Sequence, residues 1–100
     1  MNFDQTFGNV FKRLRTSNGY SQEDFHTAVT DRYIRMLEKG KASPTLATVD
    51  KLAKILGIDP VAMMVLCEVE AAAEIEGVEA VLERIANQVR LFGGFSKPQD

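Results

Sequence analysis

The side chains in this sequence that are best suited to bind a ligand lie between residues 30 and 45. Four of them recur at three- and four-residue spacing, which places them on one face of a helix: Arg32, Arg35, Met36 and Lys39. Arginine can donate two hydrogen bonds to a guanine, lysine binds phosphate as a point charge, and methionine can pack against a thymine methyl. The same pattern also suits an ordinary solvated basic helix face, so the spacing alone leaves both interpretations open.

No arrangement of residues indicates catalysis. The chain has a single histidine, His26, and a single cysteine, Cys67, so it has neither a Cys/His cluster for a metal nor an internal disulfide. Paired catalytic carboxylates, nucleophile–base sets and Gly-rich phosphate loops are not recognisable either. We therefore expect a protein that is not an enzyme and that uses neither a cofactor nor a metal.

The charge is divided unevenly along the chain. Residues 1–57 hold nine basic and six acidic side chains, whereas residues 58–100 hold three basic and eight acidic ones. This division suggests that the first part meets a polyanion such as DNA while the second part stays away from it. A net charge of +3 is nevertheless common in domains that bind no nucleic acid.

Length and composition restrict the class of protein. One hundred residues, 45% hydrophobic and 26% charged, are typical of one folded domain. No apolar stretch approaches the ~18 residues of a membrane-spanning helix, and the N-terminus lacks the pattern of a signal peptide. We expect a cytoplasmic protein without a membrane segment.

The apolar residues follow a helical period nearly throughout, so the predicted fold class is all-α. Helices are expected over residues 3–18, 21–28, 31–39 and 46–56, from Asp59-Pro60 onwards, and over residues 78–92. In the fourth helix the predicted core face is Leu46, Val49, Leu52, Ala53 and Leu56. In the fifth helix it is Val61, Met64, Val65 and Val69.

Four segments in register resemble the lambda Cro/cI-type (XRE-type) helix-turn-helix family, in a compact form with a helix-turn-helix shorter by about two residues. They are residues 19–25 (GYSQEDF), 33–41 (YIRMLEKGK), 43–46 (SPTL) and 52–58 (LAKILGI). The resemblance spans about residues 7–67. It implies a five-helix lambda repressor-like DNA-binding domain over residues 1–67. It also implies a homodimeric repressor of a pseudo-palindromic operator in double-stranded DNA, with helix 31–39 in the major groove.

The resemblance also implies roles for individual residues. Base contacts are expected from the start and outer face of the third helix: Thr30, Asp31, Arg32, Tyr33, Arg35 and Met36. Phosphate contacts are expected from Lys12, Arg13, Ser21, Gln22, Lys39, Lys41, Ser43 and Thr45. Asp31 is also a candidate N-cap, and so are Ser43 and Thr45. Arg15 and Glu38 are expected to form a structural ion pair between the first and third helices.

Residues 68–95 lie beyond this family pattern and are acidic. They end in an amphipathic helix with an apolar stripe: Val78, Val81, Leu82, Ile85, Val89 and Phe92. One short helix cannot bury such a stripe by itself. We expect the stripe to join two copies in a homodimer, with packing against the chain's own core as the alternative. A third possibility is an antitoxin-like protein, whose acidic C-terminal half binds another protein. Residues 96–100 are expected to be a flexible tail.

Overall fold

Residues 2–95, the part of the chain that the computed structural model describes, fold into helices joined by turns and loops, without a strand. The elements are α1 (Phe3–Ser17), the 3-10 helix η1 (Gln22–Phe25), α2 (Asp31–Glu38), α3 (Leu46–Leu56), α4 (Pro60–Ala71) and α5 (Val78–Phe92). The predicted all-α fold class is confirmed. The expected flexible tail, residues 96–100, lies outside the described residues.

The core lies among the first four α-helices and η1. Its fully or almost fully buried side chains are Phe7, Val10, Phe11, Phe25, Ile34, Leu37, Val49, Leu52, Ala53, Met63 and Cys67. The ring of Phe25 packs edge-on against that of Phe11, with 5.1 Å between centroids, and so fixes η1 to α1. The expected core position of Leu46 is wrong, because its side chain is 80% exposed. Leu46 is the first residue of α3, and helical side chains lean toward the N-terminus, which here lies beyond the core.

The second helix is shorter than the predicted helix over residues 21–28. It is one 3-10 turn, closed by bonds such as His26 N–H to the Glu23 carbonyl at 3.1 Å. Phe25 is its only buried residue. A segment with one apolar anchor, followed at once by the cap of α2, has no packing that would stabilise a second turn.

The predicted core face of α4 is wrong except at Met64, which is partly buried against the core. Met63 and Cys67 point into the core, whereas Val61, which was expected there, is 68% exposed. Apolar residues lie on most sides of α4, so the helical period does not single out one face. The contacts of α4 with α1 and α3 determine which of its faces is buried.

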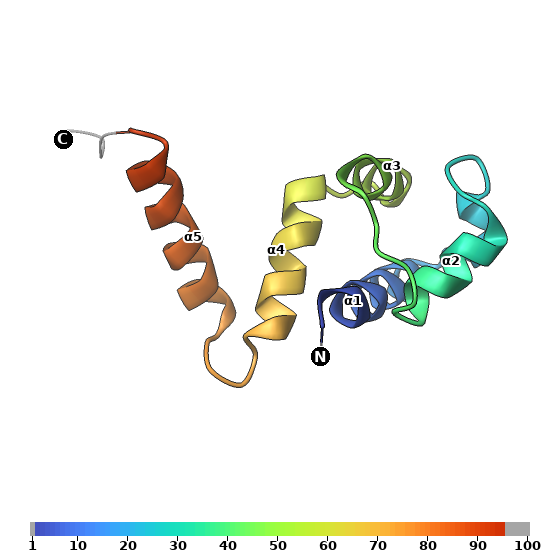
Figure 1. Ribbon diagram of the computed structural model, residues 1–100, viewed down its shortest axis with the longest axis horizontal. Coiled ribbons are helices and arrows are strands. Elements are labelled where there is room, and N and C mark those ends of the chain that lie inside the picture. The colour runs from blue at the N-terminus through green and yellow to red at the C-terminus, as the bar shows by residue number, and fades with distance from the viewer. Residues whose placement is uncertain (1, 96–100) are drawn as a thin grey trace.

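The last helix stands apart from the core. Figure 1 shows α5 leaving the end of α4 through a loop and running away from it at an open angle. Within α5 only Val81 is buried, and Arg84 pairs with Glu76 (Nε–Oε1 3.3 Å) and Glu68 (Nη1–Oε2 3.7 Å). The boundary expected at residue 67 falls inside α4, which continues to Ala71.

Candidate nucleic-acid interface

The helix expected to meet DNA, α2, is fixed at both ends by local hydrogen bonds. Thr30 is its N-cap, with the side-chain oxygen accepting a hydrogen bond from the Tyr33 N–H at 3.1 Å. Asp31, one of the candidate caps, is instead the first helical residue. At the other end Lys41 N–H donates to the Met36 carbonyl and Gly40 N–H to the Leu37 carbonyl, at 2.9 and 3.0 Å. This Schellman turn needs the positive φ of Gly40, +72°.

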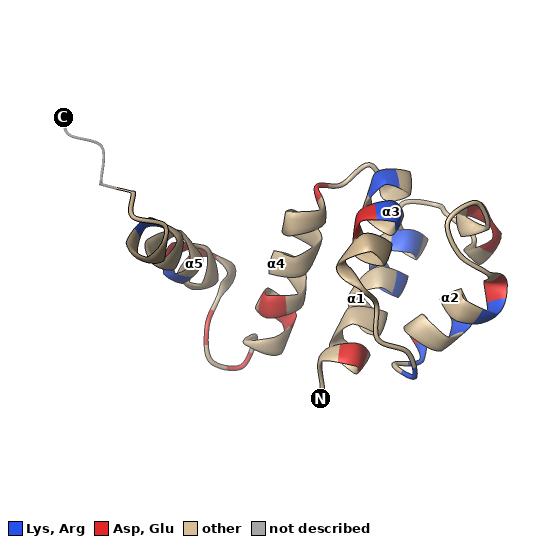
Figure 2. Ribbon diagram, turned by 45° about the horizontal axis from the view of Figure 1, so that its top comes forward, with Lys and Arg blue, Asp and Glu red and all other residues tan. Residues whose placement is uncertain are grey.

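The two faces of α2 differ as the spacing predicts. Ile34 and Leu37 are buried in the core. The side chains of Arg32, Arg35 and Lys39 are exposed, and those of Tyr33 and Met36 are half-buried beside them. Within residues 2–95 no acidic side chain pairs with these three cations. Figure 2 shows Lys and Arg along α2 and in the chain just after it, and Asp and Glu at the end of α4 and in the loop before α5.

A close approach of α1 holds α2 in place. A Cβ atom on Gly8 would lie 2.3 Å from the Leu37 carbonyl oxygen, so no larger residue fits there without movement. The absence of a side chain lets the middle of α1 reach the C-terminal turn of α2. The position of the cationic face therefore depends on Gly8.

Arg15 and Glu38 join α1 to α2 from the side. Arg15 Nε and Nη2 donate to the two carboxylate oxygens of Glu38, at 2.6 and 2.9 Å, and both side chains are about nine-tenths buried. Arg15 Nη1 also donates to the Tyr20 carbonyl at 3.0 Å. The hydrogen bond with Glu38 raises the pKa of Arg15 above its ordinary value. Arg15 is thus committed to the fold and is not part of the exposed surface.

Gln22, expected to bind phosphate, is part of this network. Its Nε2 donates to Glu38 Oε1 at 3.0 Å, so in this structure its amide faces the ion pair. The neighbouring Ser21 is exposed and is the N-cap residue of η1, where its N–H donates to Asp24 Oδ2 at 2.7 Å.

The loop after α2 is held against α1 by a residue that the sequence did not single out. The Ser43 hydroxyl contacts both carboxylate oxygens of Asp4, at 2.7 and 2.6 Å, and the Tyr33 hydroxyl donates to the Ser43 carbonyl at 3.4 Å. Ser43 therefore anchors the loop rather than presenting a free hydroxyl. Asp4 is 39 residues away along the chain, and no local pattern could have indicated this contact.

Of the remaining phosphate candidates, Thr45 caps α3, since its hydroxyl oxygen accepts from the Thr48 N–H at 3.1 Å. Arg13 pairs with Glu70 of α4 at 2.7 Å, which ties it to the acidic part of the chain. Lys12 and Lys41 are exposed, and neither forms an ion pair within the described part of the chain. The sequence alone could not separate Arg13 from Lys12, because the partner of Arg13 lies 57 residues away.

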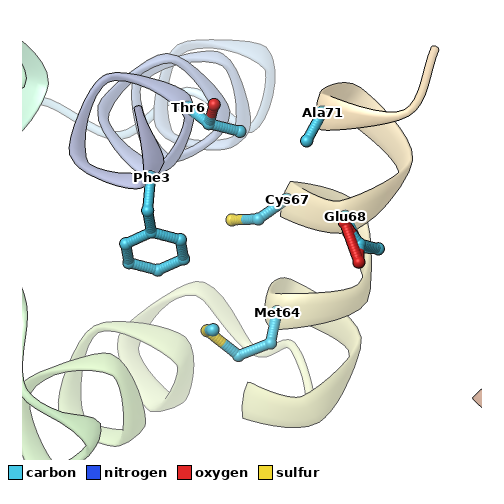
Figure 3. Close-up of a pocket in the computed structure, with 6 residues that line it drawn as sticks. All are labelled: Phe3, Thr6, Met64, Cys67, Glu68 and Ala71. Carbon is cyan, nitrogen blue, oxygen red and sulfur yellow. The ribbon is translucent and has the colours of Figure 1, made fainter. Parts of the chain in front are cut away.

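A separate hollow lies between α1 and α4, away from the cationic face. It has a volume of about 330 Å³, and Figure 3 shows the sulfur atoms of Cys67 and Met64 and the ring of Phe3 turned toward it. Burial, assisted by the charge of Glu70, raises the pKa of the Cys67 thiol to about 11. The thiol is therefore protonated near neutral pH and unreactive as a nucleophile.

Two short helical elements joined by a turn, η1 and α2, have the arrangement of a helix-turn-helix, and the second presents cations to solvent that have no ion-pair partner within residues 2–95. The helix-turn-helix family matches residues 11–62 of this chain, which is half of its length and includes η1, α2 and α3. The chain belongs to this family, in its XRE-type branch, and is a DNA-binding transcriptional regulator.

Two relatives carry names of the same class. An HTH-type transcriptional regulator of Sinorhizobium fredii (strain NBRC 101917 / NGR234), y4dJ, is 32% identical over 66 residues, covering 64% of this chain and 86% of that protein. The SPbeta prophage-derived HTH-type transcriptional regulator YonR of Bacillus subtilis (strain 168) is 46% identical over 55 residues. This second match covers 52% of this chain and half of that protein. No solved structure matches the chain significantly.

Among residues 2–95 no three His, Cys, Asp or Glu side chains lie close enough together to hold a metal ion. The helices of that range are all too short or too polar to cross a membrane.

Proposed function

We propose that this protein is a repressor that binds a pseudo-palindromic operator as a homodimer, with α2 of each copy in the major groove. The observation that carries the proposal is the exposed cationic face of α2, where Arg32 and Arg35 lie one turn apart and form no ion pair within residues 2–95. Guanidinium groups in this position can each donate two hydrogen bonds to a guanine.

The residues around this face support a division of roles. Arg32, Arg35 and the half-buried Met36 are the proposed base readers, with Asp31 and Thr30 at the tip of the helix. Lys39 and Lys41 flank the Schellman turn and are the proposed phosphate contacts, together with Lys12. Ser43, Gln22, Thr45 and Tyr33 act mainly by holding the backbone that carries these groups, through the contacts given above.

A homodimer would place two such helices about one turn of DNA apart, ~34 Å, on a site with two-fold symmetry. Occupation of a promoter by such a dimer would block transcription. The acidic stretch from Glu68 to Glu76 would remain away from the phosphates, since DNA repels it.

A partner-binding protein, such as an antitoxin that regulates its own operon, is the second candidate. The observation that favours it is the apolar stripe of α5, because Val89 and Phe92 are exposed rather than packed on the core. In that case α5 would bind a different protein and not a second copy.

Selection of bound fragments from genomic DNA with the purified full chain tests the first proposal. We expect one enriched sequence with inverted half-sites, and we expect transcription in vitro from a promoter containing it to fall when the protein is added. Equal retention of unrelated duplexes at the same salt concentration would show non-specific binding and overturn the proposal. Enrichment without loss of transcription would overturn the repressor role alone.

A further inference from the structure

We propose that α4 and α5 form one half of a four-helix bundle, and that the other half is the α4–α5 hairpin of a second copy of this chain. The inference deepens the proposed function and depends on its homodimer, because it specifies which surface joins the two copies. In particular, it makes α4 part of the interface, in addition to the stripe on α5.

The first observation is a regular seam on α5. Five apolar side chains alternate at spacings of four and three residues: Val78, Leu82, Ile85, Val89 and Phe92. This is the spacing at which helices pack along a shared seam. All of these except the half-buried Ile85 are exposed, up to 83% for Phe92. Val81, which was expected to belong to the dimer stripe, is instead fully buried within its own chain.

The second observation is a groove that continues the seam onto α4. It encloses about 450 Å³ between the two helices, and seven of its eight lining residues are apolar: Val61, Ala62, Val65, Leu66, Val69, Val78 and Leu82. Val78 and Leu82 belong to both the seam and the groove, so the two surfaces are continuous. In Figure 1 α4 and α5 diverge away from their connecting loop.

A second copy fits this surface because the seam is nearly symmetric about its centre. Val78 and Phe92 lie seven residues on either side of Ile85. If two antiparallel α5 helices cross at Ile85, the apolar side chains of one would therefore pack against those of the other along the whole length of the helices. A two-fold interface requires this kind of self-complementary patch. No charged residue lies in the seam, and Asp59 is the only one that lines the groove.

The exposed area is sufficient for a dimer. Val61, Val78, Leu82, Val89 and Phe92 are 43–83% exposed and together present roughly 500 Å² of surface, which is in the upper part of the ~300–600 Å² of the largest apolar patch on a typical monomer, a patch that is often functional. Two copies would bury about twice this area plus the polar rim. That total approaches the ~1,200–2,000 Å² of a standard stable interface.

The hairpin is also held in one shape before any partner arrives. Arg84 of α5 pairs with Glu76 in the connecting loop and with Glu68 of α4, and Val81 of α5 is fully buried. A surface that is already ordered loses less conformational entropy on association than a flexible one.

Sedimentation of the full chain without DNA tests the inference with three glutamate variants. The wild type should be a dimer at micromolar concentration. Leu82→Glu on α5 and Val61→Glu on α4 should each raise the dimer dissociation constant by at least ~100-fold, because a carboxylate would be buried without a partner. Val61 lies in the first turn of α4, where the helix dipole favours an acid, so this variant should fold normally. The matched control is Ala80→Glu, which is exposed on α5 outside the seam and should change the constant little.

Each outcome is decisive. If Leu82→Glu dissociates the dimer and Val61→Glu does not, the copies meet through α5 alone and the four-helix bundle is wrong. A wild type that remains monomeric at the highest attainable concentration also overturns the inference, and leaves α5 to a foreign partner. Binding of the selected duplex is measured separately on the same samples. A monomer that still binds it selectively overturns this inference and the homodimer of the proposed function, but not selective DNA binding. A dimer that binds no duplex selectively overturns only the proposed function.

Discussion

The guanidinium of Arg15 and the carboxylate of Glu38 make two parallel hydrogen bonds across the junction of α1 and α2, with both groups almost completely buried. This pair fixes the C-terminal turn of α2, next to the exposed cations, relative to the first helix. Gly8 acts at the same junction by letting the two helices approach. The cationic face is thus held by contacts that lie beneath it.

Removing one member of this pair should destabilise the fold strongly. In Glu38→Gln the Arg15 cation would stay buried without its counter-charge, which costs ~3–5 kcal/mol in the free energy of unfolding. Urea denaturation followed by circular dichroism measures the change. The control is Asp50→Asn, which breaks the exposed Lys54–Asp50 pair and should cost less than ~1 kcal/mol. Equal effects of the two variants would contradict a structural role for the buried pair.

The two arginines of α2 should affect sequence preference, whereas Lys41 should not. Arg32→Ala or Arg35→Ala should lose ~1–3 kcal/mol on the selected operator and relax its base preference. Lys41→Ala should weaken binding to all duplexes alike and reduce the salt dependence by about one counterion. Fluorescence anisotropy with operator and scrambled duplexes at several salt concentrations separates the two behaviours. The assignment of base readers is wrong if the arginine variants behave like the lysine variant.

A side chain at position 8 should push α1 and α2 apart. Alanine has a higher helix propensity than glycine, so propensity alone would predict that Gly8→Ala stabilises the protein. Because the new Cβ atom would lie 2.3 Å from the Leu37 carbonyl oxygen, Gly8→Ala should instead cost ~1–3 kcal/mol of stability, as overpacking does. Thermal unfolding shows whether Gly8→Ala is less or more stable than the wild type. Lys12→Ala, exposed on the same helix, is the control and should be within ~0.5 kcal/mol of the wild type.

Two substitutions of Thr45 should distinguish a role in capping α3 from a role in binding a DNA phosphate. Thr45→Ala removes the acceptor for the Thr48 N–H and should cost ~1 kcal/mol of stability. Thr45→Asp keeps a good cap and should restore that stability, but it adds a negative charge. If the residue lies near a phosphate, the aspartate variant binds all duplexes more weakly than the alanine variant. Equal DNA affinity of the two variants would indicate that Thr45 is a cap only.

The buried thiol of Cys67 should make stability fall at alkaline pH. Its pKa is about 11 in the folded chain, against an ordinary value of 9.0, so below pH 9 both states are protonated and its contribution is fully present. Between pH 9 and 11 the unfolded chain releases the proton first, and this contribution is lost as pH rises.

Urea midpoints of the wild type and Cys67→Ala, compared from pH 7 to 11, measure this effect. At pH 7 the alanine variant should have the lower urea midpoint, because the substitution leaves a cavity. The difference in midpoint between the two proteins should become smaller above pH 9. All other groups are common to both proteins, so their effects on stability cancel in the difference. A constant difference over the whole range would contradict the raised pKa.

Local patterns were sufficient for most of the helices and for the exposed face of α2. Caps and stop signals such as Asp59-Pro60, Gly40 and Gly57 act within one turn of chain, and the three- and four-residue spacing of Ile34 and Leu37 determines which side of α2 faces inward. Local patterns gave wrong predictions where a segment has too few apolar residues, or has apolar residues on too many of its sides. Phe25 alone supports only one turn of η1, and α4 is apolar on so many sides that its core face could not be chosen.

The sequence by itself determined the all-α class, the family and the cationic stripe, because these depend on residue types at fixed short spacing. Only the tertiary structure decided that Arg13 pairs with Glu70, that Ser43 contacts Asp4 and that Gln22 contacts the buried ion pair. The physical reason is separation along the chain. These partners are 57, 39 and 16 residues apart, and they meet only because the packing of whole helices brings their side chains within hydrogen-bonding distance.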